Sequence, residues 1–398
     1  MKRTGSHNLL RFLNIINLLF VSASIIPLLS GCRTVETLPP PIHNSTSWSV
    51  KTACGIDALC LLNGLTGNRL SVERMGTEIK RWKSRLNQTE LESLNALAAW
   101  QNETKSIMHS LVLKPFVAAG ASTLYEVIEL CDKPEVMKNA IMETQKRTGP
   151  RNTYYDKNSF KEFTSHLQDL KIVLNGLERL GFSSYWAENH EEHLTDQASR
   201  LLTHASDYNI IPEVEKALGF SLPGDQVTFY LCEYLQPFGN HLLPGVFATE
   251  TKIPDDHLVR TAIHELLHDP CYNYDPQFWH TADLAWADDF IRTSYENRDL
   301  RFGYNNFGYY YVEDAVRALE QYISARLGIA RPLSERFGPE EDGGMHVLAA
   351  VFYELMDEYG FDEESGGFRG FIIKCEKMGI LTNGGLQRLY RSFMKKTH

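Results

Sequence analysis

The chain has 398 residues, of which 43% are hydrophobic, and a formal net charge of −10 at neutral pH. This length allows two or more domains, and the sequence contains no visible internal repeat. The acidic balance, without any dense cluster of lysine and arginine, argues against a nucleic-acid partner.

The first residues have the pattern of an export signal. Lys2, Arg3 and Arg11 precede a mostly apolar run over residues 12–29. The run closes with Leu-Ser-Gly-Cys at Cys32, which resembles the lipobox of bacterial lipoproteins, where the cysteine becomes the lipidated first residue. We therefore predict a signal peptide over residues 1–31 and a membrane lipid anchor at Cys32. The alternative is a single membrane-spanning anchor in the same segment.

Either anchor places the rest of the chain outside the cytoplasm. Removing residues 1–31 changes the formal charge from −10 to −13, because three basic residues and no acidic ones are lost. In the lipoproteins that this segment resembles, the residue after the cysteine directs sorting, and Arg33 is not the aspartate that retains a protein in the inner membrane. We expect a protein of the bacterial cell envelope that is held by its lipid anchor, in the outer rather than the inner membrane. The oligomeric state stays open.

Six cysteines remain in this oxidising compartment if Cys32 is lipidated. They are enough for three disulfide bridges, but they are spread too widely for a disulfide scaffold and can equally be buried thiols. The six are Cys54, Cys60, Cys131, Cys232, Cys271 and Cys375.

Composition divides the remaining chain into three parts. Residues 32–51 are rich in proline and serine, which predicts a flexible tether. Apolar residues then recur at helical spacing, which predicts a helical domain over residues 52–180. A third domain follows over residues 181–398. Near its start, His190 and His193 imitate a metal site, but their polar surroundings favour a solvated helix face.

The third domain begins with helical spacing and then changes character. Residues 226–235 and 243–251 are rich in β-branched and aromatic side chains, and a turn separates them. We expect two antiparallel strands here, with an edge to which an extended peptide can add. Helices are expected near residues 285–297, 310–327, 345–359, 368–378 and 386–395. The predicted fold class is α+β, predominantly α-helical, with a small antiparallel sheet.

One motif dictates a chemistry. His264 and His268 are four residues apart, so on a helix both imidazoles project from one face and can hold one metal ion. Glu265 lies beside the open side of such a metal, where a carboxylate suits a general base. An N-cap at Asp255 or Asp256 and a stop at Pro270 would bound this helix. The alternative is a core helix with two satisfied histidines.

A catalytic zinc ion normally has three protein ligands and a water molecule. The best third ligand is Glu313, on the first turn of a predicted helix 45 residues after His268. Glu320, two turns further along that helix, is a rival. Asp283 and His280 are the remaining alternatives.

Glu313 lies in Glu-Asp-Ala-Val-Arg-Ala, and the paired motifs resemble the gluzincin group of zinc metallopeptidases. They also resemble uncharacterised bacterial lipoprotein families that combine H-E-x-x-H with a later E-x-x-V-R-A. The resemblance covers about residues 182–327 and implies a zincin-like domain, a Zn²⁺ cofactor held by His264, His268 and Glu313, and a peptide or protein substrate. It implies that Glu265 activates the attacking water.

The sequence departs from the well-known gluzincins at Arg317, where an acid often orients a ligand histidine. Arg317 can pair with Glu313 instead, and Asp269 or Asp314 then becomes the candidate for orienting a histidine. A donor for the oxyanion must also exist. The candidates are Tyr309, Tyr310, Tyr311 and His346.

Two other functions compete with a peptidase. The chain could be a non-catalytic zincin-like lipoprotein that binds or scaffolds a partner, although an intact Glu265 argues against this because a structural site needs no base. It could also be a zinc hydrolase of non-protein amides, such as those of the cell wall. No wall-binding repeat supports that second possibility.

Overall fold

The computed structural model describes residues 43–104, 106–148, 157–235, 239–272, 276–298, 306–338, 342–363 and 366–397. Contacts divide the chain into one unit over Met1–Pro39 and a second over Pro40–His398, and all described residues belong to the second. The predicted signal peptide, Cys32 and most of the predicted tether lie outside the described residues. None of the helices within the described ranges is long and apolar enough to cross a membrane.

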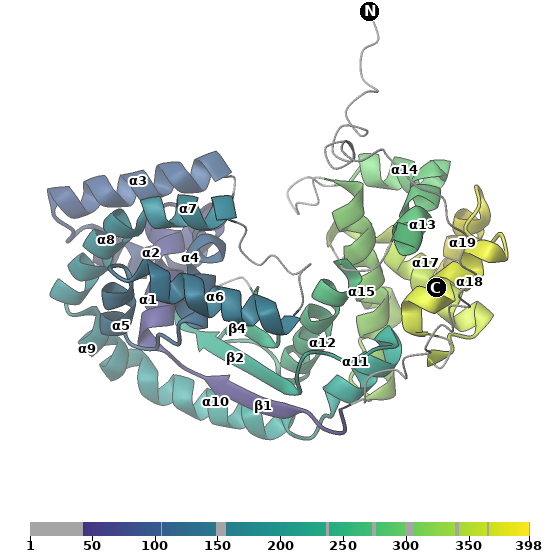
Figure 1. Cartoon of the computed structure of the whole chain (residues 1–398), viewed down its shortest axis with the longest axis horizontal. Coiled ribbons are helices and arrows are strands. Elements are labelled where there is room, and N and C mark those ends of the chain that lie inside the picture. The colour runs from purple at the N-terminus through teal and green to yellow at the C-terminus, as the bar shows by residue number, and fades with distance from the viewer. Residues whose placement is uncertain are drawn as a thin grey trace, which may run out of the picture. The chain divides into compact units, whose positions relative to one another are not determined.

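A four-stranded mixed sheet lies at the centre of the second unit (Figure 1). Its strands are β1 (Ser47–Lys51), β2 (Gln226–Cys232), β3 (Asn240–Leu243) and β4 (Val246–Glu250), in the order β1-β2-β4-β3. The fold is α+β and predominantly helical, as the sequence predicts. The expected antiparallel pairing of the strands at 226–235 and 243–251 is wrong, however, because β2 and β4 run parallel. The antiparallel partner of β4 is β3, which the sequence did not reveal.

Strand β1 falls inside the segment predicted to be a tether. It pairs in parallel with β2, from Ser47 opposite Gln226 to Lys51 opposite Tyr230. Trp48 fixes its position, since the indole nitrogen donates to the carbonyl oxygen of Tyr208 at 2.9 Å. The tether prediction is therefore wrong for residues 47–51, where alternating serine masked the strand pattern of Trp48 and Val50.

Helices form the remainder of the first half of the unit. They are α1 (Cys54–Leu65), α2 (Arg69–Lys83), α3 (Gln88–Thr104), α4 (Met108–Ala118), α5 (Leu124–Leu130), α6 (Pro134–Thr148), α7 (Lys157–Ser165), α8 (Leu167–Arg179), α9 (Phe182–Trp186), α10 (Glu192–Ala205) and α11 (Ile210–Leu218). Helix α1 is buried from Gly55 to Leu65 and packs against α4 and β2. Each of its leucines contributes about 1.5–3 kcal/mol by leaving water. Helix α10 packs along β1 (Figure 1).

The second half contains the motif helix and its partners. These helices are α12 (Asp255–Tyr272), α13 (Pro276–Ala287), α14 (Asp289–Glu296), α15 (Phe307–Arg326), α16 (Leu333–Arg336), α17 (Val347–Tyr359), α18 (Gly367–Lys377) and α19 (Gly385–Thr397). The single helix expected over residues 285–297 is thus two helices, with Asp288 capping the second through Phe290 and Ile291. All six cysteines in the described residues are free thiols, and five of them are buried.

Helix α12 contains the motif and lies between the sheet and α15 (Figure 1). It begins at Asp255, so Asp255 and Asp256 form its first turn, where their negative charges favour the helix dipole. The predicted stop at Pro270 is wrong, because the helix runs on to Tyr272. Proline only removes one backbone donor near the end of the helix. The two additional residues bring Tyr272 beside the motif.

Candidate metal centre

The two motif histidines meet on one face of α12. Their Nε2 atoms are 3.0 Å apart, and the side chains of His264 and His268 are 19% and 17% exposed. Leu266, Leu267 and Ile263 occupy the buried side of the same helix. The apolar side chains thus anchor one side of the helix in the core, and the two histidines project from another side.

Glu313 reaches both histidines from the facing helix α15. One carboxylate oxygen lies 3.6 Å from His264 Nε2 and the other lies 3.5 Å from His268 Nε2. The residue is only 5% exposed, and α12 and α15 pack closely against each other. A carboxylate in this position offers a third possible donor beside the two imidazoles.

These donor atoms suit a zinc ion. Zinc–nitrogen bonds of about 2.0–2.1 Å at a tetrahedral angle place two ligand atoms about 3.3 Å apart. The two imidazole nitrogens are 3.0 Å apart, and each lies 3.5–3.6 Å from a different oxygen of Glu313. The group of three possible ligand atoms that all lie within 4.8 Å of one another here consists of His264, Glu265 and His268. Burial also lowers the pKa of His264 well below its usual value, and only a neutral imidazole can ligate a metal. Buried His268 Nδ1 has no hydrogen-bond partner among the described residues.

Arg317 stabilises the charge of Glu313. Its Nε donates to the Oε1 atom of Glu313 at 2.7 Å, one helical turn further along α15. Burial by itself would raise the pKa of Glu313, but the neighbouring charges of His264 and Arg317 hold it well below its usual value. Because Arg317 stays charged when both histidines are neutral, its contribution persists in the state that binds metal.

Glu265 follows the first histidine and lines a cavity of about 610 Å³ together with His264. One carboxylate oxygen of Glu265 and one ring nitrogen from each of the two histidines lie within 4.8 Å of one another. Burial raises the pKa of Glu265, while the charges of His268 and Lys114 act in the opposite direction. A carboxylate beside the two histidines is placed to take a proton from a water molecule and to return it.

The rival third ligands lie elsewhere. Glu320 accepts a hydrogen bond from Ser324 and pairs with Arg336 at 2.7 Å. His280 faces Glu376 at 3.5 Å, and Asp283 is exposed on α13. The structure thus brings Glu313, and none of these three, within 4 Å of the motif histidines.

Three of the four candidate oxyanion donors are buried and already hydrogen-bonded. Tyr310 donates to the carbonyl oxygen of Met345 at 2.7 Å, Tyr311 contacts the hydroxyl of Thr281 at 2.8 Å, and His346 meets Asp314 at 2.5 Å. Asp314 therefore orients His346 and not a motif histidine. Tyr309 is 53% exposed and packs edge-on against Tyr272. Tyr272 in turn stacks on the ring of His268.

Sequence reasoning missed two residues that lie next to this site. His241 on β3 lies 3.6 Å from Asp269, and Lys114 on α4 acts electrostatically on both Asp269 and Glu265. Burial raises the pKa of Asp269 to about 7, against the opposing charge of Lys114. Helix α4 packs on β3, and this contact carries both residues to the motif helix. A single sequence offers no signal for such a contact.

His190 and His193, interpreted from the sequence as solvated, form a group with Glu233 in which the possible ligand atoms all lie within 4.8 Å of one another. Glu233 approaches His193 Nε2 at 3.4 Å, and His190 Nε2 hydrogen-bonds to the hydroxyl of Tyr234 at 3.0 Å. His193 is exposed, in agreement with the sequence interpretation, while His190 is half-buried.

Comparison with known proteins adds no family to these observations. No protein-family model, no curated protein and no solved structure matches the chain.

Proposed function

We propose that the protein is a zinc-dependent metallopeptidase of the gluzincin type. One observation carries the proposal: both carboxylate oxygens of Glu313 face the Nε2 atoms of His264 and His268 from a separate helix. An ordinary core helix with two satisfied histidines does not require a buried carboxylate between them. The donor set is that of hydrolytic zinc sites.

The residues divide the chemistry among them. His264, His268 and Glu313 would hold the ion, which when bound would act as a Lewis acid toward a substrate carbonyl and a water molecule. Glu265 takes the proton of the attacking water and returns it to the departing amine. Hydrolysis thus breaks the bond between the carbonyl carbon and the nitrogen, and yields a carboxylate and an amine.

The cellular setting follows from the N-terminal sequence. An export signal over residues 1–31 would carry the enzyme out of the cytoplasm, and lipidation of Cys32 would hold it on a membrane of the cell envelope. The residue after Cys32 favours the outer over the inner membrane. Substrates would then be peptides or proteins outside the cytoplasm.

Metal content and turnover test this proposal together. We expect one zinc per chain in the purified wild type, loss of that zinc in His264→Ala, and retention in His280→Ala, which removes an exposed histidine paired with Glu376. Glu265→Gln should keep zinc and lose hydrolysis of a mixed peptide library read by mass spectrometry. Absence of metal in the wild type would favour the alternative of a non-catalytic lipoprotein that binds or scaffolds a partner. Retained hydrolysis in Glu265→Gln would exclude Glu265 as the base.

A further inference from the structure

The cavity beside the motif is lined mainly by polar and charged side chains. Four arginines line it, together with His264 and Glu265. The four are Arg260, Arg317, Arg331 and Arg336. Three carboxylates of the described residues line the same cavity, those of Glu250, Glu265 and Glu320. Four guanidinium groups thus stand beside three carboxylates in the lining, and a further carboxylate, that of Glu313, pairs with Arg317.

Structural contacts hold each of the four arginines in place. Arg336 pairs with Glu320 at 2.7 Å, and Arg317 pairs with Glu313 at 2.7 Å. Arg260 donates to the carbonyl oxygen of Ile329 at 2.9 Å. The fourth, Arg331, donates to the carbonyl oxygen of Glu335 at 3.3 Å. Guanidinium groups held by such contacts form a pre-organised surface for a planar anion.

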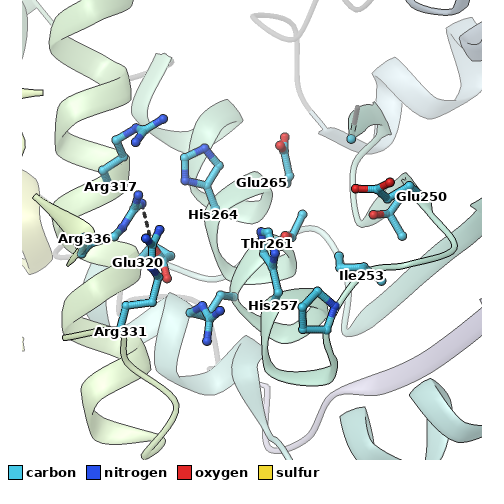
Figure 2. A pocket seen from close by; sticks show the side chains of 14 residues that line it. Glu250, Ile253, His257, Thr261, His264, Glu265, Arg317, Glu320, Arg331 and Arg336 are labelled. Carbon is cyan, nitrogen blue, oxygen red and sulfur yellow. Dashed lines mark ion pairs between the residues drawn. The ribbon is translucent and has the colours of Figure 1, made fainter. Parts of the chain in front are cut away.

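The arginines also act on one another and on the motif. The positive charges of Arg331 and Arg336 act to lower the pKa of Arg260. Those of Arg317 and Arg336 act to lower the pKa of His264. Figure 2 shows Arg317, Arg331 and Arg336 on one side of the cavity and Glu250 on the other, with His264 and Glu265 between them. An anionic group of a substrate would therefore lie toward the arginines, close to the reacting carbonyl.

We propose that this arginine pocket binds a carboxylate of the peptide substrate next to the scissile bond. The inference rests on the proposed peptidase function and specifies its substrate class. A C-terminal carboxylate always belongs to the fragment that departs as the amine. An enzyme that binds this carboxylate next to the scissile bond therefore releases short C-terminal fragments. The side chain of an aspartate or glutamate supplies the same chemistry within a longer peptide.

Binding to an inactive variant tests the pocket without turnover. Three probes are titrated calorimetrically into full-length Glu265→Gln protein: acetyl-Ala-Ala-Ala acid, its C-terminal amide, and acetyl-Ala-Glu-Ala amide. We expect the acid, the glutamate peptide or both to bind about tenfold more tightly than the neutral amide, because charge-assisted arginine contacts are lost in the amide. Preference for the first probe identifies a terminal carboxylate, and preference for the third identifies an acidic side chain.

Arginine variants locate the effect. Adding Arg331→Gln to Glu265→Gln should reduce the preference for the carboxylate, and Arg331→Lys should retain part of it. Arg388→Gln on α19, which removes an exposed arginine paired with Glu358, is the matched control and should change nothing. Circular dichroism verifies the fold of each variant, and the comparison of probes on Glu265→Gln alone stands even if an arginine variant fails to fold.

The two proposals fail in different ways. Equal affinity for all three probes would overturn the arginine pocket, while hydrolysis by the wild type would still support the peptidase. Preference for a carboxylate without any hydrolysis by the wild type would keep the pocket as an anion-binding site and reject the peptidase function.

Discussion

Arg317 and Glu313 form a buried ion pair on α15, with 2.7 Å between Nε and Oε1, and the same carboxylate faces both motif histidines. At the position four residues after Glu313, where the sequence resemblance to gluzincins predicts an acid, the chain carries an arginine that contacts the carboxylate directly. The ion pair keeps Glu313 ionised in a buried environment, where it would otherwise favour its neutral form.

Arg317→Met should therefore weaken metal binding. Without the guanidinium the pKa of Glu313 rises, so protons compete better with the ion, and we expect a loss of about 10–100-fold in zinc affinity. Competition with a chromogenic chelator near neutral pH measures it. Arg388→Met is the control, because Arg388 pairs with Glu358 at 2.9 Å, outside both the donor set and the cavity lining. Wild-type affinity in Arg317→Met would contradict this role.

Tyr309→Phe should lower turnover without preventing substrate binding. Tyr309 is the exposed member of the four candidate donors, and its ring packs on that of Tyr272, which in turn stacks on His268. Loss of one oxyanion donor costs about 10²-fold in kcat and little in KM. Steady-state kinetics on a peptide cleaved by the wild type gives both constants.

Tyr310→Phe provides the comparison for that experiment. Its hydroxyl donates to the carbonyl oxygen of Met345, so its removal should lower the free energy of unfolding by about 1 kcal/mol and leave kcat near that of the wild type. A wild-type kcat in Tyr309→Phe would leave the oxyanion donor unassigned to any of the four residues.

Local spacing explains what could be predicted from the sequence. His264 and His268 share a helix face because of the helical period, and Glu313, predicted to lie on a second helix, contacts both of them. The strand segments at β2 and β4 were recognisable by composition, but their parallel pairing was not. The short strand β3 lies between β2 and β4 in the sequence but at the edge of the sheet, beside β4. No local pattern in β2 or β4 indicates that they pair with each other directly.

The missed residues reach the site through distant contacts. Lys114 belongs to a helix about 150 residues before the motif, and only the packing of α4 on β3 brings it to Asp269. Continuation of α12 past Pro270 was equally invisible, because proline is compatible with helical φ and the lost hydrogen bond lies near the helix end. Tertiary packing thus places Lys114, whereas the continuation of α12 is a local property of the helix end.

Lys114→Met should shift the acid limb of the pH profile of kcat/KM to higher pH. The positive charge of Lys114 lowers the pKa of both Asp269 and Glu265, so its removal raises them, and a general base must be ionised to act. Lys114→Arg keeps the charge and should keep the profile. Rates of peptide hydrolysis between about pH 5 and about pH 8 distinguish the variants. An unchanged acid limb in Lys114→Met would show that this charge does not govern the site.

Asp57→Asn should alter stability in a pH-dependent way. Asp57 is fully buried on α1 and accepts hydrogen bonds from Trp186 Nε1 at 2.7 Å and from the backbone nitrogens of Glu233 and Tyr234 at 3.1 and 2.9 Å. Asparagine replaces one acceptor oxygen with a donor, so a buried group loses its partner. We expect a loss of about 1–3 kcal/mol in the free energy of unfolding at acidic pH.

The slope with pH gives the sharper test. Burial raises the pKa of Asp57 from 3.8 to about 7, so the carboxyl binds a proton on folding. Its contribution is fully present below the pKa of the unfolded chain and is lost as the pH rises from about 4 to about 7. Urea unfolding at about pH 5 and about pH 8 should therefore show a smaller fall in stability for Asp57→Asn than for the wild type. Asp269, whose pKa is also raised to about 7, should account for part of the slope that remains, and Asp57→Asn with Asp269→Asn should flatten it further. A slope in Asp57→Asn equal to that of the wild type would mean that Asp57 is already ionised in the folded protein, held so by its three donors.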